Sequence, residues 1–307
     1  MILVTGGTGF VGRNLIKQLL RQDKQVRILV RPAKKTPNLP KDTAVEVVVC
    51  SLQDERGLRA AMKGVQQVFH LASAERAGSR VDLEAVDVQG TRRVAAAAVQ
   101  AGVQHMFYLS HVGADRGSAY SVMKVKGIAE GLIQQSGIRN TVIRSTAIFG
   151  PGDQFTTSFS RLLQRAPGLL LIPGDGESML QPIWVEDVVT CMLSAIETAE
   201  GENKVYSIGG PEYFSYRQVL DILAERMELR RSYVPVHPSI LRSLWLILEQ
   251  GNPRFPVSIH WLDHLAADRT CPVDSVAREF GLLPSRFTQH LDHLHPDPKK
   301  RIKNNER

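Results

Sequence analysis

A tyrosine and a lysine four residues apart are the side chains in this sequence best suited to proton transfer. They are Tyr120 and Lys124, in the segment Tyr-Ser-Val-Met-Lys. On a helix, residues at positions i and i+4 share a face, so the two side chains would lie together. The lysine charge would lower the pKa of the tyrosine, which could then exchange a proton with a carbonyl or an alcohol during hydride transfer. The alternative interpretation of this pair is an ordinary exposed helix face.

A glycine-rich turn at the start of the chain could hold the phosphates of a dinucleotide. Gly7, Gly9 and Gly12 fit the spacing G-x-G-x-x-G, between the apolar run 2–4 and a segment, 13–20, with helical spacing of apolar residues. Such glycines make the tight turn, let backbone amides approach a pyrophosphate, and let the helix pack on its strand. The helix N-terminus would face the anion with unpaired N–H groups. The alternative is a purely structural turn.

This turn resembles that of the extended and atypical short-chain dehydrogenase/reductases. Thr5, Gly6, Gly9 and Gly12 match the family motif Thr-Gly-x-x-Gly-x-x-Gly, and the family carries its Tyr-x-x-x-Lys on the helix after the fifth strand. Further matches lie in segments 68–72, 144–146, 149–152 and 182–187, so the resemblance extends to about Leu294. It is nearest to the subgroup that includes the nucleotide-binding accessory subunit of respiratory complex I. The resemblance implies an α/β fold, a doubly wound parallel (Rossmann) sheet with a small C-terminal substrate lobe.

The resemblance also implies which residues hold the cofactor. These residues are Gly6, Thr8, Gly9, Phe10, Val11, Gly12, Arg31, Lys35, Ser51, Leu52, Leu71, Ala72, Ser73 and Lys124. Two positions depart from the family pattern. Ser51 stands where an adenine-contacting Asp is common, and Asp87 stands where the family usually has Asn.

A third departure concerns catalysis. His111 stands where the family carries its catalytic serine, and Ser110 is the residue before it. A neutral imidazole can donate a hydrogen bond to a substrate oxygen, so His111 could polarise the substrate. Tyr120 would then be the acid/base, and Lys124 would orient the ribose and lower the tyrosine pKa. Loss of turnover is the other interpretation, and the sequence leaves both open.

The end of the second predicted strand indicates the cofactor. NAD enzymes of this architecture usually place an acidic residue there to hold the ribose 2′-hydroxyl. This chain has Val30, Arg31 and Pro32 there, with Lys34 and Lys35 close behind. An arginine can pair with a 2′-phosphate through charge-assisted hydrogen bonds. The sequence therefore predicts NADP(H) in preference to NAD(H), the alternative being a solvated basic loop.

Composition narrows the remaining possibilities. The 307 residues have a hydrophobic content of 43% and a charged content of 22%, ordinary for a soluble globular protein. The net charge is +7, of which +4 lies in residues 299–307. No interleaving of aromatic and basic residues indicates nucleic-acid binding. Three widely spaced cysteines and the absence of a cleavable signal favour a cytoplasmic protein. The family resemblance implies a small-molecule substrate. No signal indicates the oligomeric state.

The apolar pattern predicts the order of elements. Strands are expected at 2–4, 26–30, 45–49, 68–71, 105–110 and 141–144, with helices between them, including an alanine-rich one at 83–101 and another at 118–136. This alternation is typical of parallel strands joined by helical crossovers. Residues 1–150 are predicted to form the dinucleotide-binding core, 151–295 a mixed, mostly C-terminal substrate lobe, and 296–307 a basic disordered tail.

Two features of the second half have no place in this chemistry. The segment 239–249 predicts a helix capped by Ser239, with a wide apolar stripe that includes Trp245. We expect this stripe either to pack on the core of the lobe or to form a lipid-like pocket or a peripheral membrane contact. The histidines His290, His293 and His295 are expected to be solvated rather than to bind a metal.

Two functions are therefore consistent with the sequence. The first is an NAD(P)H-dependent oxidoreductase or epimerase-like enzyme acting on a carbonyl or alcohol, with an apolar substrate as one possibility. The second is a structural, assembly or regulatory protein that binds NADPH without turnover.

Overall fold

The computed structural model describes residues 1–32, 45–198, 203–252 and 255–294. These residues fall into two compact units. Unit 1 comprises Met1–Glu75, Val81–Ser145 and Val185–Ile208, and unit 2 comprises Arg76–Arg80, Thr146–Trp184 and the chain from Gly209 onward. The division expected near residue 150 therefore lies close to Ser145, but the chain later returns to unit 1 for one helix and one strand. Residues 296–307, expected to be a disordered tail, lie outside the described ranges.

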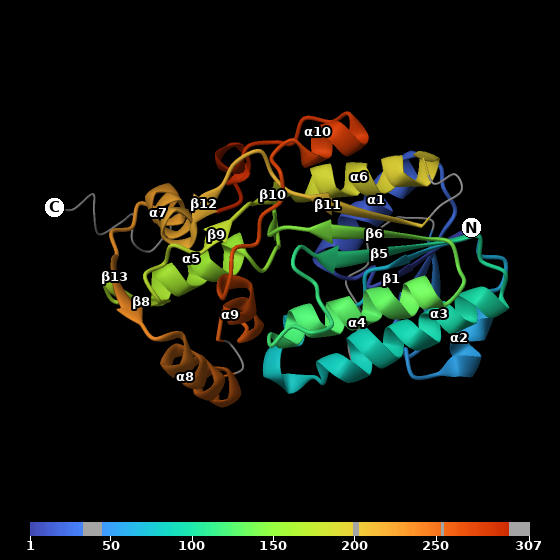
Figure 1. Ribbon diagram of the computed structural model, residues 1–307, viewed down its shortest axis with the longest axis horizontal. Coiled ribbons are helices and arrows are strands. Elements are labelled where there is room, and N and C mark those ends of the chain that lie inside the picture. Colours follow the sequence, from blue (N-terminus) through green and yellow to red (C-terminus); the bar gives the residue numbers. More distant parts are fainter. Residues whose placement is uncertain (33–44, 199–202, 253–254, 295–307) are drawn as a thin grey trace. The chain divides into compact units, whose positions relative to one another are not determined.

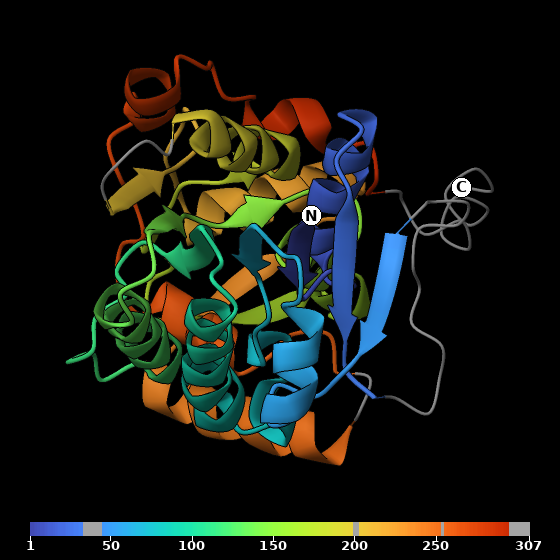
Figure 2. The same ribbon diagram turned by 90° about the vertical axis from the view of Figure 1, so that its right-hand side faces the viewer.

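A parallel sheet of seven strands, in the order β11-β6-β5-β4-β1-β2-β3, forms the centre of unit 1. The strands are β1 (Ile2–Thr5), β2 (Val26–Val30), β3 (Val45–Val49), β4 (Gln67–His70), β5 (His105–His111), β6 (Asn140–Ser145) and β11 (Lys204–Ile208). Figure 2 shows β3, in light blue, at an edge of this sheet. The apolar run Ile2–Val4 is buried on both faces, as a central parallel strand requires.

Helices cover both faces of the sheet in unit 1. They are α1 (Phe10–Arg21), α2 (Glu55–Ala61), α3 (Thr91–Gln100), α4 (Ser121–Gln135) and α6 (Val185–Thr198). In Figure 1, α1 and α6 lie side by side above the strands, and α2, α3 and α4 lie below them. This is the predicted doubly wound α/β fold. The helix expected at 83–101 begins as a wider π-helical segment, η2 (Glu84–Gly90), and continues as α3.

The strand order places a switch point between β1 and β4. From β1 the chain adds β2 and β3 on one side, whereas β4, β5 and β6 extend the sheet on the other side. In open α/β sheets, ligands bind outside the carboxyl ends of the strands at such a point. The turn after β1 and the segment Leu71–Ser73 after β4 therefore border the expected ligand position.

Unit 2 is built of short strands and helices around an aromatic core. Its strands are β7 (Ile148–Phe149), β8 (Leu169–Pro173), β9 (Met179–Leu180), β10 (Ile183–Trp184), β12 (Phe214–Ser215) and β13 (Ser232–Val236). Its helices are α5 (Thr156–Arg165), α7 (Tyr216–Arg226), α8 (Pro238–Gly251), α9 (His260–Leu265) and α10 (Ser275–Phe280), with the 3-10 turn η3 (Phe287–His290). The strands pair in twos, and β8 and β13 run parallel.

The structure divides the apolar stripe predicted for α8. Leu241 and Trp245 are buried in the core of unit 2, whereas Ile240, Leu244, Ile247 and Leu248 are exposed. The helix also starts earlier than predicted, because Pro238 occupies its first turn. The N-cap is His237, whose side chain accepts a hydrogen bond from the Ser239 amide, so the predicted Ser239 cap is wrong.

The C-terminal histidines are not solvated in the way the sequence suggested. His290 is half-buried and stacks on Trp184, with ring centroids 4.2 Å apart. His293 is also half-buried and forms a 3.0 Å hydrogen bond with Thr156. Both side chains therefore belong to the packing of unit 2, and His295 lies outside the described residues. None of the helices in the described ranges has the length and hydropathy needed to cross a bilayer.

Candidate functional site: an anion cradle beside a buried ion pair

The turn after β1 forms a cradle that only glycine permits. Gly6 has φ +70°, and a Cβ added there would lie 2.6 Å from the backbone carbonyl carbon of Leu71. A Cβ at Gly12 would collide with the carbonyl oxygen of Gly6. The turn is closed by a 2.9 Å hydrogen bond from the Gly9 amide to that same oxygen. The backbone of this turn therefore contacts the segment Leu71–Ser73 after β4, which we call the β4 loop, and such close approach is what a dinucleotide cradle requires.

The N-terminus of α1 opens onto this cradle. Its N-cap is Gly9, which has no side chain to cap the first backbone amides, and its first turn holds no acidic residue. Arg13 donates a 2.8 Å hydrogen bond to the Thr8 carbonyl, which places a cation beside the turn. Phe10 and Val11, in that first turn, are half-buried. Backbone amides, helix dipole and guanidinium all favour an anion here, so the geometry fits a pyrophosphate.

Other predicted cofactor residues follow the strands next to β1. Leu71, Ala72 and Ser73 are half-buried at the carboxyl end of β4, and Ser51 and Leu52 are half-buried after β3. Arg31 is exposed directly after β2, where a 2′-phosphate would need it, and Lys35 lies outside the described residues. The Ser51 hydroxyl accepts a 3.2 Å hydrogen bond from the Gln53 amide. The first acidic residue after β3 is Asp54, which caps α2 instead of facing a ribose.

A chain of buried hydrogen bonds runs beneath the β4 loop. Thr91 donates to the Asp87 carbonyl at 2.5 Å, so its oxygen is left to accept from Nε2 of His70 at 2.9 Å. Nδ1 of His70 then accepts from the Thr5 hydroxyl at 2.7 Å. Burial is the main cause that lowers the pKa of His70, to about 3, with the Lys126 charge adding to it. The imidazole is therefore neutral and fixed in one tautomer.

Asp87 connects this chain to a buried lysine. One carboxylate oxygen accepts a 2.8 Å hydrogen bond from the Ala74 amide, and the other lies 3.3 Å from Nζ of Lys126. The Lys126 and Asp87 side chains are 5% and 1% exposed. Nζ also lies over the ring of Tyr108, 5.2 Å from its centroid. Burial alone would lower the pKa of Lys126, but Tyr108 and Asp87 outweigh it and raise that pKa, so the ammonium stays charged at neutral pH.

The structure does not bring Tyr120 and Lys124 together on an inward face. Tyr120 is the N-cap of α4, with extended φ and ψ, and Lys124 is exposed. The i, i+4 argument requires both residues within the helix, which starts only at Ser121. The inward face of α4 instead carries Val122, with Lys126 one turn later. Tyr120 is half-buried beside this face.

A signal for Lys126 was present in the sequence. Lys126 falls at i+4 from Val122 and i−3 from Ala129, on the apolar stripe of α4, where a charge needs a partner. Glu130, one turn further, is 3% exposed and forms a two-pronged pair with Arg144, at 3.0 and 2.5 Å. Lys126 and Glu130 are therefore two ionic residues on an otherwise buried stripe of α4.

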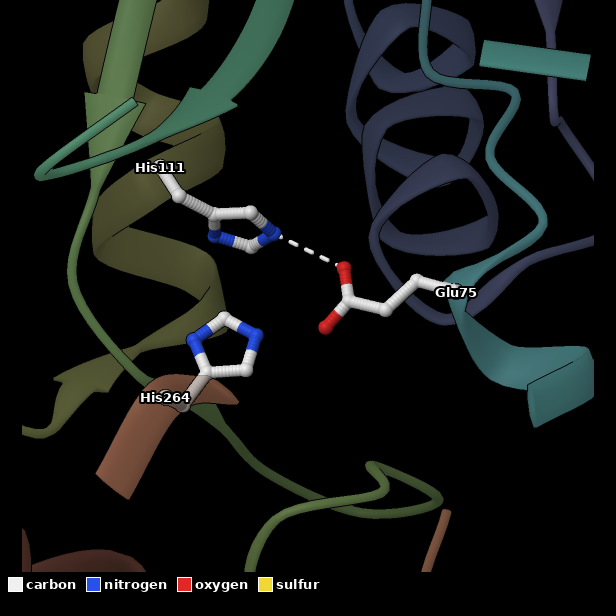
Figure 3. Close-up of side chains that lie close together, drawn as sticks. All are labelled: Glu75, His111 and His264. Atoms are coloured by element: carbon white, nitrogen blue, oxygen red, sulfur yellow. Dashed lines mark hydrogen bonds and ion pairs between the residues drawn. The ribbon is translucent and has the colours of Figure 1, made fainter. Parts of the chain in front are cut away.

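His111 lies at the end of β5 and pairs with a residue that sequence reasoning missed. Its Nε2 lies 2.8 Å from Oε2 of Glu75, and the two side chains are 20% and 21% exposed. Figure 3 shows the ring and the carboxylate facing each other. Ser110, in contrast, is fully buried. A carboxylate that orients an imidazole is an arrangement that proton-transfer pairs use. At the end of β5, the partly exposed polar side chain is that of His111, whereas that of Ser110 is buried.

Comparison with known proteins identifies the family. The chain matches the model of the NmrA-like family over residues 1–290. It is similar to sterol demethylase protein B of Methylococcus capsulatus, 27% identical over an alignment of 318 positions, which covers 92% of this chain and 93% of the relative. It is also similar to the mitochondrial NADH dehydrogenase (ubiquinone) 1 alpha subcomplex subunit 9 of Arabidopsis thaliana, 24% identical over 78% of this chain and 61% of that protein.

A solved structure shows the same fold. The NADPH-dependent quinone oxidoreductase QOR2 of Escherichia coli, in complex with NADPH, has a TM-score of 0.76 to this chain at 20% identity, covering 96% of this chain and 99% of that one. The fold, the glycine motif and the family model therefore agree. This chain belongs to the NmrA-like family, on the atypical branch of the short-chain dehydrogenase/reductases that its first turn resembles.

Proposed function

We propose that unit 1 binds NADP(H) in preference to NAD(H), and that the protein is an oxidoreductase or epimerase-like enzyme acting on a carbonyl or alcohol of an apolar substrate. The observation that carries the proposal is the glycine cradle at Gly6 and Gly12, which lies against the β4 loop above the Lys126–Asp87 pair. The relatives fit this proposal: one is a sterol demethylase protein, and the E. coli oxidoreductase was solved with NADPH.

Cofactor preference rests on the end of β2. Arg31 is exposed there, and the described residues after β2 and β3 offer no carboxylate before Asp54. An arginine gains charge-assisted hydrogen bonds from a 2′-phosphate, whereas a ribose 2′-hydroxyl needs an acceptor. We expect titration calorimetry to give at least about tenfold tighter binding of NADPH than of NADH, and Arg31→Ala to remove most of that difference. Equal dissociation constants in the wild type would overturn the preference.

Lys126, rather than Lys124, is the lysine proposed to act toward the cofactor. Its ammonium is buried near the β4 loop and pairs with the Asp87 carboxylate. The Ala74 amide holds that carboxylate in place through a hydrogen bond. Bound NADPH would supply a hydride to a carbonyl carbon, and the resulting oxygen would need one proton. His111, held by Glu75, is the group proposed to deliver that proton, with Tyr120 as the alternative donor.

Turnover tests this chemistry. We expect NADPH absorbance to fall in the presence of a sterol-like or quinone carbonyl, and His111→Gln to slow that fall by at least about a hundredfold with little change in cofactor affinity. Tyr120→Phe distinguishes the two proposed proton donors, because the rate should fall only in the variant that lacks the residue that delivers the proton. Wild-type rates in both variants would contradict proton transfer by either residue.

A second candidate function is NADP(H) binding without turnover. Two observations favour it. Val122, on the inward face of α4, has no proton to exchange with a substrate, and the Lys126 side chain, paired with Asp87, is only 5% exposed. The similarity to a subunit of a respiratory NADH dehydrogenase supports the same view. A protein that is purified with NADPH, and whose cofactor persists unchanged with every carbonyl tested, would favour this function over the enzyme.

A further inference from the structure

A groove between α2 and α3 of unit 1 has no role in the chemistry described above. Its volume is about 420 Å³, which lies within the range of small-molecule clefts. We call it the α2–α3 groove. Its charged lining residues are Glu55 and Arg59 of α2 and Arg92 and Arg93 of α3. None of its lining residues belongs to the glycine cradle or to the segments after β3 and β4 that are proposed to hold the cofactor.

The backbone of the two helices fixes the walls of this groove. On α3, Arg92, Ala96 and Gln100 are four residues apart and share one face, as Glu55 and Arg59 do on α2. Ala96 lines the groove between the two longer side chains of its row. A methyl group at this position leaves the space that a larger side chain would fill.

The lining of the groove is rich in unpaired positive charge. Three arginines against one glutamate leave a net charge of +2. Arg59 and Arg92 form neither a hydrogen bond nor an ion pair with any residue in the described part of the chain. Glu55 and Arg93 pair only at 4.0 Å, with side chains 67% and 32% exposed, and such surface pairs are weak. The guanidinium groups are therefore available to a ligand.

Acidic residues next to the groove do not cancel this charge. The exposed acids of the same and adjoining segments are Asp54, Asp82 and Glu84, and none of them lines the groove. The carboxylates of Asp54 and Asp82 accept hydrogen bonds from backbone amides of α2 and η2. The exposed cations Arg56 and Lys63 offset two of the three acids. The positive charge of +2 is thus local to the groove.

Charge and hydrogen-bond donors select the ligand. Guanidinium groups bind phosphate oxygens through paired, charge-assisted hydrogen bonds, and a phosphomonoester carries up to two negative charges at neutral pH. The side-chain amides of Gln89 and Gln100 add neutral donors to the lining, and the volume leaves room for an organic part beside the phosphate. We propose that the α2–α3 groove binds a small molecule that carries a phosphomonoester group. The site is separate from the proposed NADP(H) site, since α2 and α3 lie on the face of the sheet opposite α1 (Figure 1).

Phenyl phosphate and phenyl sulfate are matched probes of this groove. They share a ring and a tetrahedral oxyanion, but the phosphate gains a second negative charge above about pH 6. Amide chemical shifts of α2 and α3 in the full chain, followed by NMR during titration, report occupancy of the groove. We expect phenyl phosphate to bind at least about fivefold more tightly than phenyl sulfate at about pH 7.5. The difference should disappear at about pH 5, where both probes carry one charge.

Substitutions separate a seated ligand from diffuse attraction by charge. Arg59→Gln and Arg92→Gln should each weaken phenyl phosphate binding at least about fivefold. Arg56→Gln is the matched control, because it removes the same charge from an exposed residue of α2 outside the lining, and it should change affinity less than about twofold. Ala96→Leu should also weaken binding, since it fills the groove without changing its charge. Circular dichroism melting checks that each variant folds.

Three results would overturn the proposal. They are equal affinities for the two probes at about pH 7.5, an equal loss in Arg56→Gln and Arg59→Gln, and amide shifts that are absent from α2 and α3. The second result would mean that binding follows net charge alone. Titration with NADPH should give the same affinity in Arg59→Gln as in the wild type, so a failure of this proposal leaves the proposed cofactor site untouched.

Discussion

The two units of this protein bury different kinds of side chain. Unit 1 buries Asp87, Lys126 and His70 and gives each a specific partner beneath the β4 loop. Unit 2 buries rings, such as Phe155 stacked on Trp261 at 5.2 Å and Phe159 edge-on to Trp261 at 5.3 Å. A buried charge depends on one partner, whereas a packed ring shares its contacts among many neighbours. Single polar changes in unit 1 should therefore cost more than conservative apolar changes in unit 2.

The largest expected effect comes from breaking the buried ion pair. Asp87→Ala leaves the Lys126 ammonium buried without its carboxylate, which should lower the free energy of unfolding by about 3–5 kcal/mol. Urea denaturation measures this change. The double variant Asp87→Ala/Lys126→Met should recover much of the loss, because no charge is then left unpaired. Lys124→Met, at an exposed lysine of the same helix, should change stability by less than about 0.5 kcal/mol.

The second effect is a pH dependence that belongs to unit 1. The pKa of His70 is about 3 in the folded protein and about 6.5 when the chain unfolds, so the unfolded state binds more protons between these values. Stability is therefore complete above about pH 6.5 and falls as the pH drops, by about 2–3 kcal/mol from this residue at about pH 4.5. His105, whose pKa is lowered to about 4, chiefly by burial, adds a fall of the same sign.

His70→Gln separates the two histidines. The variant should be less stable at neutral pH, yet its stability should depend more weakly on pH between about 6.5 and 4.5, since the residual slope comes from groups such as His105. Urea denaturation at several pH values measures both quantities. An unchanged slope would mean that burial does not hold His70 neutral in the folded protein.

The smallest expected effect lies in unit 2. Phe159→Leu should lower the free energy of unfolding by about 1.5 kcal/mol, because the neighbouring rings can adjust to an apolar side chain of similar size. Asp87→Asn, an equally conservative change in unit 1, removes the charge opposite Lys126 and should cost more. If Phe159→Leu proved the more damaging of the two in urea denaturation, the contrast between the units would be wrong.

Much of unit 1 could be predicted from the sequence because its elements are local. Apolar runs such as Val26–Val30 and Val45–Val49 matched the observed strands. Asp54, the N-cap of α2, is one of the residue types that N-caps favour. The capping box of α7, formed by Ser215 and Gln218, was equally readable. These features depend on residues a few positions apart, so neighbouring residue types specify them.

The candidate site was only partly predictable because its pairs join distant segments. The glycine turn is local and could be recognised, but Glu75 meets His111 across 36 positions. Lys126 meets Asp87 between two different helical segments, and a helix that starts at Ser121 leaves Tyr120 outside the i, i+4 pattern. The same holds for α8, where only the packing of unit 2 decides that Trp245 is buried and Ile247 is exposed.

The glycine cradle is the part of the site on which cofactor binding depends most directly. Gly6→Ala would force a Cβ to within 2.6 Å of the Leu71 backbone at a φ of +70°. Gly131→Ala, in α4, is the matched control, since a Cβ there meets nothing within 4 Å. Titration calorimetry with NADPH should show affinity lowered at least about a hundredfold in Gly6→Ala and unchanged in Gly131→Ala, with both variants folded by circular dichroism. Wild-type NADPH affinity in Gly6→Ala would contradict a dinucleotide site at the β1 turn.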